Sequence, residues 1–211
     1  IGFMYRHKET TDRVKELLQG QTLVAVRSTF VCGAILNPDF PAWFKLQDKS
    51  GGPMLDQAIH VMDTLRYVVG DITRVFALGS NRATVRGPSV TVNDTLNLAL
   101  EFEGGLGGTH NHSWATRPFV CVYELLLKDG WLRVDLTGAN CLTGELRGMK
   151  IEFAPKDDCY VTEFQRFLQA VRTKDFSPIR STYRDAVKTL AVCAAANKSA
   201  ESSQAQEVQG Y

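Results

Sequence analysis

The sequence predicts an α+β protein in which a large, mostly antiparallel open sheet is covered by helices on one face. Three observations lead to this prediction: several segments with a two-residue apolar period, turn signals between them, and apolar residues at three- and four-residue spacing in other segments. Strands joined by tight turns pair antiparallel, and amphipathic helices must bury one side against the resulting sheet.

Length and composition limit the number of domains and the classes of partner that the chain can have. At 211 residues the chain is long enough for one domain, or one domain plus a fragment. The net charge of +1 gives no electrostatic reason to expect nucleic acid or an anionic membrane as partner, and no apolar run approaches the ~20 residues of a membrane span. The five cysteines are odd in number and lack a C-x-x-C pair, which indicates reduced thiols and a cytoplasmic location.

The first half of the chain contains the less regular elements. Because Ile1 already lies inside an apparent strand, we expect a piece of a longer protein. The predicted order is a strand over 1–4, a helix capped by Thr10 or Thr11 and ended at Gly20, a strand over 22–32, a loop over 37–48, a helix over 53–69 ended at Gly70, and a strand over 72–80.

The second half is mostly strand. Predicted strands span 96–102, 109–116, 119–127, 131–136 and 149–154, with a glycine turn at 104–108 and an Asp129-Gly130 hairpin. Two helices follow, the first with the apolar face Tyr160, Val161, Phe164, Phe167, Leu168 and Val171, and the second, from Ser181 or Thr182, with the stripe Tyr183, Ala186, Val187, Leu190, Ala191 and Ala194. We expect a solvated tail after about Ser199. The alternating apolar residues exceed what the helices can cover, so a homodimer or homotetramer through the open sheet face is expected.

The helix over 53–69 carries the main candidate site. Asp56 and His60 are four residues apart, which places them side by side on an α-helix. A carboxylate beside an imidazole fixes its tautomer and favours its protonated form, as in a general acid/base pair. Such a spacing also arises by chance, where it only stabilises the helix.

The string from Ser50 to His60, with Gly51, Gly52, Asp56 and His60, resembles the Gly-Gly-x-x-x-Asp-x-x-x-His segment of the glucose–fructose oxidoreductase/inositol dehydrogenase (Gfo/Idh/MocA) family. The segment Gly2 to Arg6 resembles the last strand of the family's nucleotide-binding half, and Ser181 to Ala186 resembles its closing helix. The family's third glycine is Pro53 here. Neither the Rossmann glycine fingerprint nor the Glu-Lys-Pro lysine of the family occurs in these residues.

This resemblance implies the domain organisation and the chemistry. Residues 1–21 would be the last strand and helix of a dinucleotide-binding domain that is otherwise absent, and residues 22–211 an α+β substrate-binding and oligomerisation domain. The implied reaction is hydride transfer between NAD or NADP and a secondary alcohol of a sugar, cyclitol or similar polyol. His60 would take the hydroxyl proton and Asp56 would orient it. The residues alone would neither be active nor bind the cofactor tightly.

Other candidates rank below this pair. His110, His112 and Trp114 alternate on one face of a strand, and the resemblance assigns His112 and Trp114 to substrate binding. Trp43 and Lys49 precede the Asp56 helix and are candidates for the mouth of a substrate pocket. Tyr5 and Arg6 end the first predicted strand, where they would face the cofactor.

Two functions from other classes stay open. A metal-dependent hydrolase would use His110 and His112 with Asp56 or His60, and metal analysis would identify it, although no metal motif is present. A non-enzymatic assembly module fits if no glycine-rich half precedes Ile1, which the upstream sequence would show. The residues specify neither the substrate, the reaction direction, nor the choice between NAD and NADP.

Overall fold

A computed structural model describes residues 1–138 and 141–210 of the chain. The α-helices are α1 (Glu9–Leu17), α2 (Gln47–Ser50), α3 (Ile59–Val68), α4 (Cys159–Thr173) and α5 (Tyr183–Ser202). The strands are β1 (Leu23–Val31), β2 (Ile72–Ser80), β3 (Thr95–Phe102), β4 (Gly107–Ser113), β5 (Val120–Leu127), β6 (Gly130–Asp135), β7 (Cys141–Leu146), β8 (Met149–Phe153) and β9 (Gln206–Glu207). The 3₁₀ turns are η1 (Met4–His7), η2 (Ala34–Leu36), η3 (Ala42–Lys45) and η5 (Glu103–Gly105), and η4 (Met54–Ala58) is a π turn.

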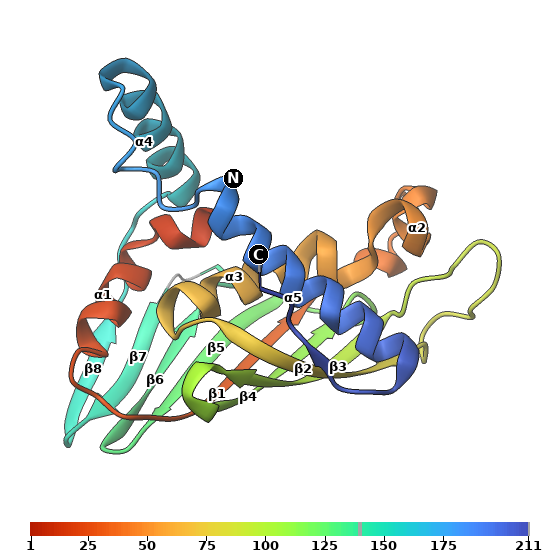
Figure 1. The fold of residues 1–211 in the computed structure, drawn as a ribbon, viewed down its shortest axis with the longest axis horizontal. Helices are drawn as coiled ribbons and strands as arrows, with labels where there is room; N and C mark the ends of the chain where they lie inside the picture. The colour runs from red at the N-terminus through yellow and green to blue at the C-terminus, as the bar shows by residue number, and fades with distance from the viewer. Residues whose placement is uncertain (139–140, 211) are drawn as a thin grey trace.

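All of these strands join one sheet in the order β8-β7-β6-β5-β1-β4-β3-β2-β9. Every pairing is antiparallel except that of β1 with β4, which are neighbours in the centre of the sheet. Helices α1, α3 and α5 lie over one face, while α4 projects away from the sheet (Figure 1). The predicted α+β fold with an open, mostly antiparallel sheet and helices on one face is therefore confirmed.

The core lies between the sheet and these helices. Alternate residues of β3 are buried there, including Leu96, Leu98, Leu100 and Phe102, as the two-residue period predicts. From the helix side, Met62 and Leu65 of α3 are completely buried against them. At ~25 cal/mol per Å² of apolar surface removed from water, this contact dominates the stability of the fold.

Several local predictions are wrong. Residues 1–3 form no strand, and η1 follows them; α1 begins after Lys8, so neither Thr10 nor Thr11 is its cap. Thr11 instead donates a hydrogen bond to the Tyr5 carbonyl oxygen over 2.7 Å. The predicted tail pairs with β2 as β9, and the sequence pattern missed β7 altogether.

The two closing helices begin near their predicted positions but bury different faces. Thr182 caps α5 by accepting a hydrogen bond from the Asp185 N–H, as predicted. Tyr183 and Leu190, however, are exposed, and the buried face of α5 is made of small residues such as Ala196 and Ser199. The apolar face of α4 is largely exposed, including Phe164 and Phe167 at 61% and 53%.

The uncovered face of the sheet is more polar than expected. Outward positions of β3 carry Asn97, Ala99 and Glu101, and Asn97 accepts a hydrogen bond from Asn111 of β4 over 2.6 Å. Glu124 of β5 forms exposed ion pairs with arginines on both neighbouring strands. On β3 the alternation places the apolar residues toward the helices, so the open face is mixed in character, with polar positions here and exposed apolar side chains such as Leu78 and Trp131 elsewhere. In the described part of the chain, no helix has the length and apolar character that crossing a membrane requires.

Candidate active site

The helix carrying Asp56 and His60 begins at two glycines that no other residue fits well. Gly51 and Gly52 have φ values of +73° and +70°, a conformation that L side chains rarely adopt. A Cβ on Gly51 would collide with Leu55, and one on Gly52 would lie 2.5 Å from Gln47 Oε1. Asn197 of α5 donates to the Gly51 carbonyl oxygen over 2.8 Å, so the start of the helix is tied to the closing helix.

The first turn of this helix is the π turn η4, which continues directly into α3. Met54 and Ala58 are completely buried, so they anchor the turn in the core. Asp56, Gln57 and His60 are half-buried at the edge of that core. Isolated π turns often occur at functional sites, and here the wider turn lies immediately before His60.

The electrostatics of Asp56 and His60 differ from the prediction. Burial lowers the pKa of His60 and raises the pKa of Asp56, so both groups are pushed toward their neutral forms. Within the described residues, His60 Nδ1 is buried without a hydrogen-bond partner and Asp56 makes no hydrogen bond or ion pair. The expectation that Asp56 favours the charged imidazole is therefore wrong. Loss of water around His60 outweighs any attraction from the carboxylate.

Aromatic rings from the beginning of the chain cover the His60 imidazole. The ring centroids of Phe3 and Tyr5 lie 6.0 Å and 6.2 Å from that of His60, in edge-to-face arrangements. Burial raises the pKa of the Tyr5 phenol well above its usual value, so this group is neutral. Tyr5, which we expected to face the cofactor, therefore lies beside His60 at the candidate site.

Gln57 is a member of this site that the sequence analysis did not select. Its side-chain oxygen accepts hydrogen bonds from Trp114 Nε1 over 2.5 Å and from the Cys32 thiol over 3.2 Å. Trp114 is completely buried, so in this structure it fixes Gln57 and does not line an open pocket. The only sequence signal for Gln57 is its place beside Asp56.

His110 and His112 share one face of β4, as predicted, and that face points into the core. His110 Nδ1 lies 2.8 Å from Ser28 Oγ, and the His112 ring stacks on Phe30 with 5.1 Å between centroids. Burial lowers the pKa of His110 to about 3, and burial with the neighbouring His110 lowers the pKa of His112 as well. His112 has no exposure to solvent, so a direct substrate contact requires a local rearrangement.

Trp43 and Lys49, the two candidates for the mouth of a substrate pocket, lie at the surface. Trp43 of η3 is half exposed and stacks on Phe44, while Lys49 of α2 is exposed and pairs with its neighbour Asp48 over 3.2 Å. Both therefore remain available at the surface near the start of the Asp56 helix. Among the residues with described positions, no group of three His, Cys, Asp or Glu side chains is arranged to hold a metal ion, so the hydrolase alternative lacks a ligand set there.

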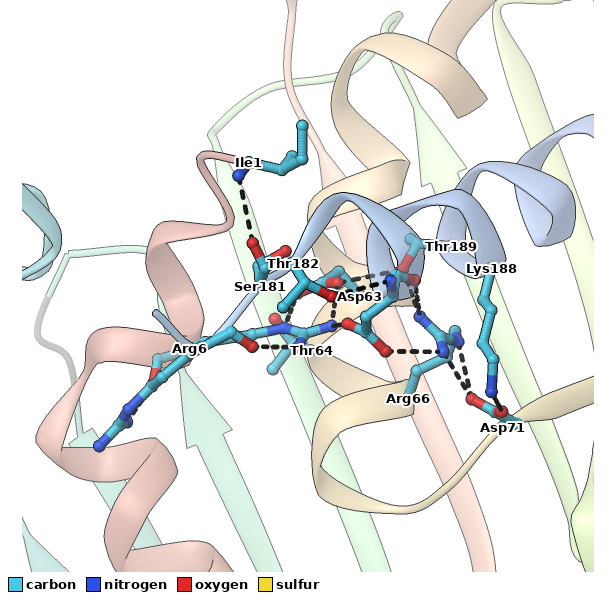
Figure 2. Close-up of polar contacts among 12 residues, drawn as sticks. Ile1, Arg6, Asp63, Thr64, Arg66, Asp71, Ser181, Thr182, Lys188 and Thr189 are labelled. Carbon is cyan, nitrogen blue, oxygen red and sulfur yellow. Dashed lines mark hydrogen bonds and ion pairs between the residues drawn. The ribbon is translucent and has the colours of Figure 1, made fainter. Parts of the chain in front are cut away.

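Arg6 is placed differently from its prediction. Its side chain is 3% exposed, and its guanidinium is bonded to Asp63, Asp185 and a backbone carbonyl (Figure 2). These charged partners raise the pKa of Arg6 although burial opposes its charge. A guanidinium buried among these partners is not open to a cofactor phosphate, so the structure does not support Arg6 as a cofactor-binding residue.

Comparison with known proteins identifies the fold and the family. Levoglucosan dehydrogenase in complex with NADH and levoglucosan superposes with a TM-score of 0.87, at 18% identity, covering 100% of this chain and 66% of that one. A putative NADPH-dependent oxidoreductase from Desulfitobacterium hafniense gives a TM-score of 0.84 at 18% identity, covering 99% and 64%. An oxidoreductase domain protein from Kribbella flavida gives 0.84 at 23% identity, covering 99% and 65%.

Among curated proteins, the uncharacterized protein UNK4.17 of Schizosaccharomyces pombe is 27% identical over 212 residues. The match covers 90% of this chain but only 52% of that protein, so the chain spans about half the length of this relative. A sequence model of the GFO/IDH/MocA C-terminal domain matches residues 11–133, which is more than half of the chain. The chain therefore belongs to the GFO/IDH/MocA family and carries its C-terminal domain.

Proposed function

We propose that this chain is the substrate-side part of an NAD- or NADP-dependent oxidoreductase that acts on a secondary alcohol of a sugar, cyclitol or similar polyol. The observation that carries the proposal is His60, a half-buried imidazole whose pKa is lowered by burial. A neutral imidazole at physiological pH is able to accept a proton, as oxidation of an alcohol requires. The similarity to a dehydrogenase solved with NADH and an anhydrosugar supports the substrate class.

Residues 1–21 are proposed to close a dinucleotide-binding domain, and residues 22–211 to form the substrate domain. Gly104 to Gly108 lead from β3 to β4, both strands of one antiparallel pair, and thus do not present a helix N-terminus to a pyrophosphate. The cofactor would therefore be held by the rest of a longer protein. The nicotinamide, when bound, supplies the hydride acceptor.

The residues of this chain supply the proton transfer. His60 would accept the hydroxyl proton of the substrate as its carbon loses hydride. Gln57, held by Trp114 and Cys32, fixes the turn from which His60 projects. Asp56, with its pKa raised by burial, would orient a substrate hydroxyl or the imidazole. Trp43 and Lys49 would contact the outer part of the sugar.

Kinetics on a longer, cofactor-competent form of the protein tests this role. The assay would follow reduced nicotinamide with NAD and NADP against levoglucosan, a cyclitol and an aldose. His60→Ala is expected to lower kcat by roughly 10²- to 10⁴-fold, the usual contribution of general acid–base catalysis, and Asp56→Asn by less. Arg13→Ala, an exposed change on α1, is the control and should leave kcat unchanged. Full activity of His60→Ala with its melting temperature unchanged would contradict the role of His60 in proton transfer. No turnover of any of these substrates by the parent protein would favour a non-enzymatic assembly role.

Self-association through the open sheet face is also proposed. Helices leave this face uncovered (Figure 1), and Leu78 of β2 and Trp131 of β6 are 55% and 42% exposed. Trp131 occupies an outward position, because its neighbour Leu132 is fully buried. Sedimentation at micromolar concentration should give a dimer or tetramer. A monomer at high micromolar concentration would contradict this arrangement.

A further inference from the structure

The segment before α1 is held to α3 by a buried, two-point ion pair. Arg6 Nε and Nη2 donate to the two carboxylate oxygens of Asp63 over 2.7 Å and 2.6 Å. The remaining Arg6 nitrogen, Nη1, donates to the Arg180 carbonyl oxygen over 2.6 Å, and Asp185 Oδ2 lies 2.5 Å from Nη2. Arg–carboxylate pairs of this kind fix orientation as well as distance.

Asp63 is also held in place by a hydrogen bond from α5. The Thr189 hydroxyl of α5 donates to Asp63 Oδ1 over 3.0 Å and accepts from Arg66 over 2.6 Å. Asp63 lies three residues after His60, so the two residues occupy neighbouring turns of the same helix. The ion pair therefore fastens η1 to the part of α3 that carries His60.

This attachment determines what covers the imidazole. Phe3 and Tyr5 precede Arg6 in the same short segment, and both rings meet the His60 ring edge-on, with interplanar angles of 89° and 68°. The Arg6 guanidinium also lies over the rings of Phe3 and Tyr67, at 5.9 Å and 4.7 Å from their centroids. Displacement of Arg6 would move the rings that exclude water from His60.

We propose that Arg6 is a positioning residue for His60: through its ion pair with Asp63 it holds the Phe3 and Tyr5 rings against the imidazole. This inference rests on the proposed role of His60 in proton transfer. The titratable groups around His60 are Asp56 and Asp63 on its own helix, Arg6 and Tyr5 from η1, and Cys121 of β5, which hydrogen-bonds to Tyr5. Burial is the resolved cause of the low His60 pKa, which agrees with a role for the covering rings.

The test is an NMR titration of the imidazole in the 211-residue chain, with the His60 signal assigned by its loss in His60→Gln. Arg6→Ala is expected to raise the His60 pKa toward the ordinary imidazole value, because the rings are no longer held and water reaches the imidazole. Arg6→Lys, which keeps the charge but loses the two-point geometry, should give a smaller rise.

The matched control removes another cation of the same network. Lys188 pairs with Asp71 over 2.6 Å at the far end of the cluster (Figure 2), and Lys188→Met should leave the His60 titration unchanged. The signal of buried His110 should stay untitrated above pH 5 in every variant, which confirms that the core is folded.

A folded Arg6→Ala chain with the wild-type His60 titration would overturn the proposal and leave Arg6 with a purely structural role. If Arg6→Ala does not fold, Phe3→Leu keeps the ion pair and removes one covering ring. It should also raise the His60 pKa, and no change would again contradict the proposal. The titration needs no substrate or cofactor, so its outcome is independent of whether His60→Ala is active in the kinetic assay.

Discussion

Helices α4 and α5 carry apolar residues at similar spacing, yet they are packed very differently. The buried face of α5 packs on β2, where the Ser199 hydroxyl accepts a hydrogen bond from the Ala77 N–H over 2.8 Å. On α4, Phe164 and Phe167 remain mostly exposed beside a groove of about 700 Å³ between α4 and residues 176–183. The helix with the larger side chains is the one that lacks a packing partner for them.

The different packing of α4 and α5 shows that apolar periodicity identifies an amphipathic helix but not the surface that covers it. Small residues such as Ala195 and Ala196 let α5 approach the sheet closely, and that face also carries polar groups whose partners lie far away in sequence. The larger residues Tyr183 and Leu190, which a hydropathy pattern would bury, stay at the surface. Substitutions in the two regions should therefore have very different effects.

The largest effect is expected in the helix–sheet core. Leu65 of α3 is completely buried, and Leu65→Ala should lower the free energy of unfolding by about 2–5 kcal/mol because it leaves a cavity. Leu190→Ala on α5 is the control, since its side chain is 46% exposed, and should cost about 1 kcal/mol or less. Urea titration of both variants measures the difference. Equal losses would mean that Leu190 is covered in solution.

Acid should destabilise the same core steeply. The pKa of His110 is lowered to about 3 in the folded chain, against about 6.5 when unfolded, so its neutral form favours folding fully above pH 6.5. That contribution is lost as the pH falls from 6.5 toward 3, at about 1.4 kcal/mol per unit. His110→Gln should remove this part of the slope in urea titrations at pH 7, 6, 5 and 4. An unchanged slope would show that His110 is hydrated in the folded state.

Elements that depend on local sequence patterns could be predicted, whereas elements that depend on contacts distant in sequence could not. Strand β3 and the Asp129-Gly130 hairpin were predicted correctly, because alternation and turn chemistry are local. Strand β7 was missed, since Gly144 interrupts the apolar positions between Leu142 and Leu146, and β9 forms only through pairing with β2.

The candidate site divides in the same way. The placement of Asp56 and His60 in one continuous helical segment could be predicted from spacing, and the glycines before it from turn geometry. The roles of Gln57 and Arg6 could not be predicted, because Trp114 and Asp63 are each 57 residues away from their respective partners. The low pKa of His60 likewise depends on Phe3 and Tyr5, which reach it only in the folded chain.

A smaller effect should appear when one hydroxyl is removed from each helix. Thr189→Val on α5 keeps the shape of the side chain but leaves Arg66 and Asp63 each without one buried partner. We expect a loss of about 1–3 kcal/mol in the free energy of unfolding, the cost of leaving buried polar groups unpaired. Thr173→Val is the matched control at the end of α4, where the exposed hydroxyl donates to the Gln169 carbonyl oxygen and accepts from the Asp175 N–H. Losses of similar size would mean that the network tolerates solvent.

The smallest expected effect concerns the exposed face of α4. Phe167→Ser should change the free energy of unfolding of the 211-residue chain by less than about 0.5 kcal/mol, because the ring is 53% exposed and gains little from folding. The same variant should bind less of a fluorescent hydrophobic dye than the parent chain, since the apolar face becomes smaller. Urea titration and dye fluorescence at two protein concentrations measure both effects. A loss above 1 kcal/mol that grows with protein concentration would show that a second copy covers this face, and α4 would then resemble α5 in having a packing partner.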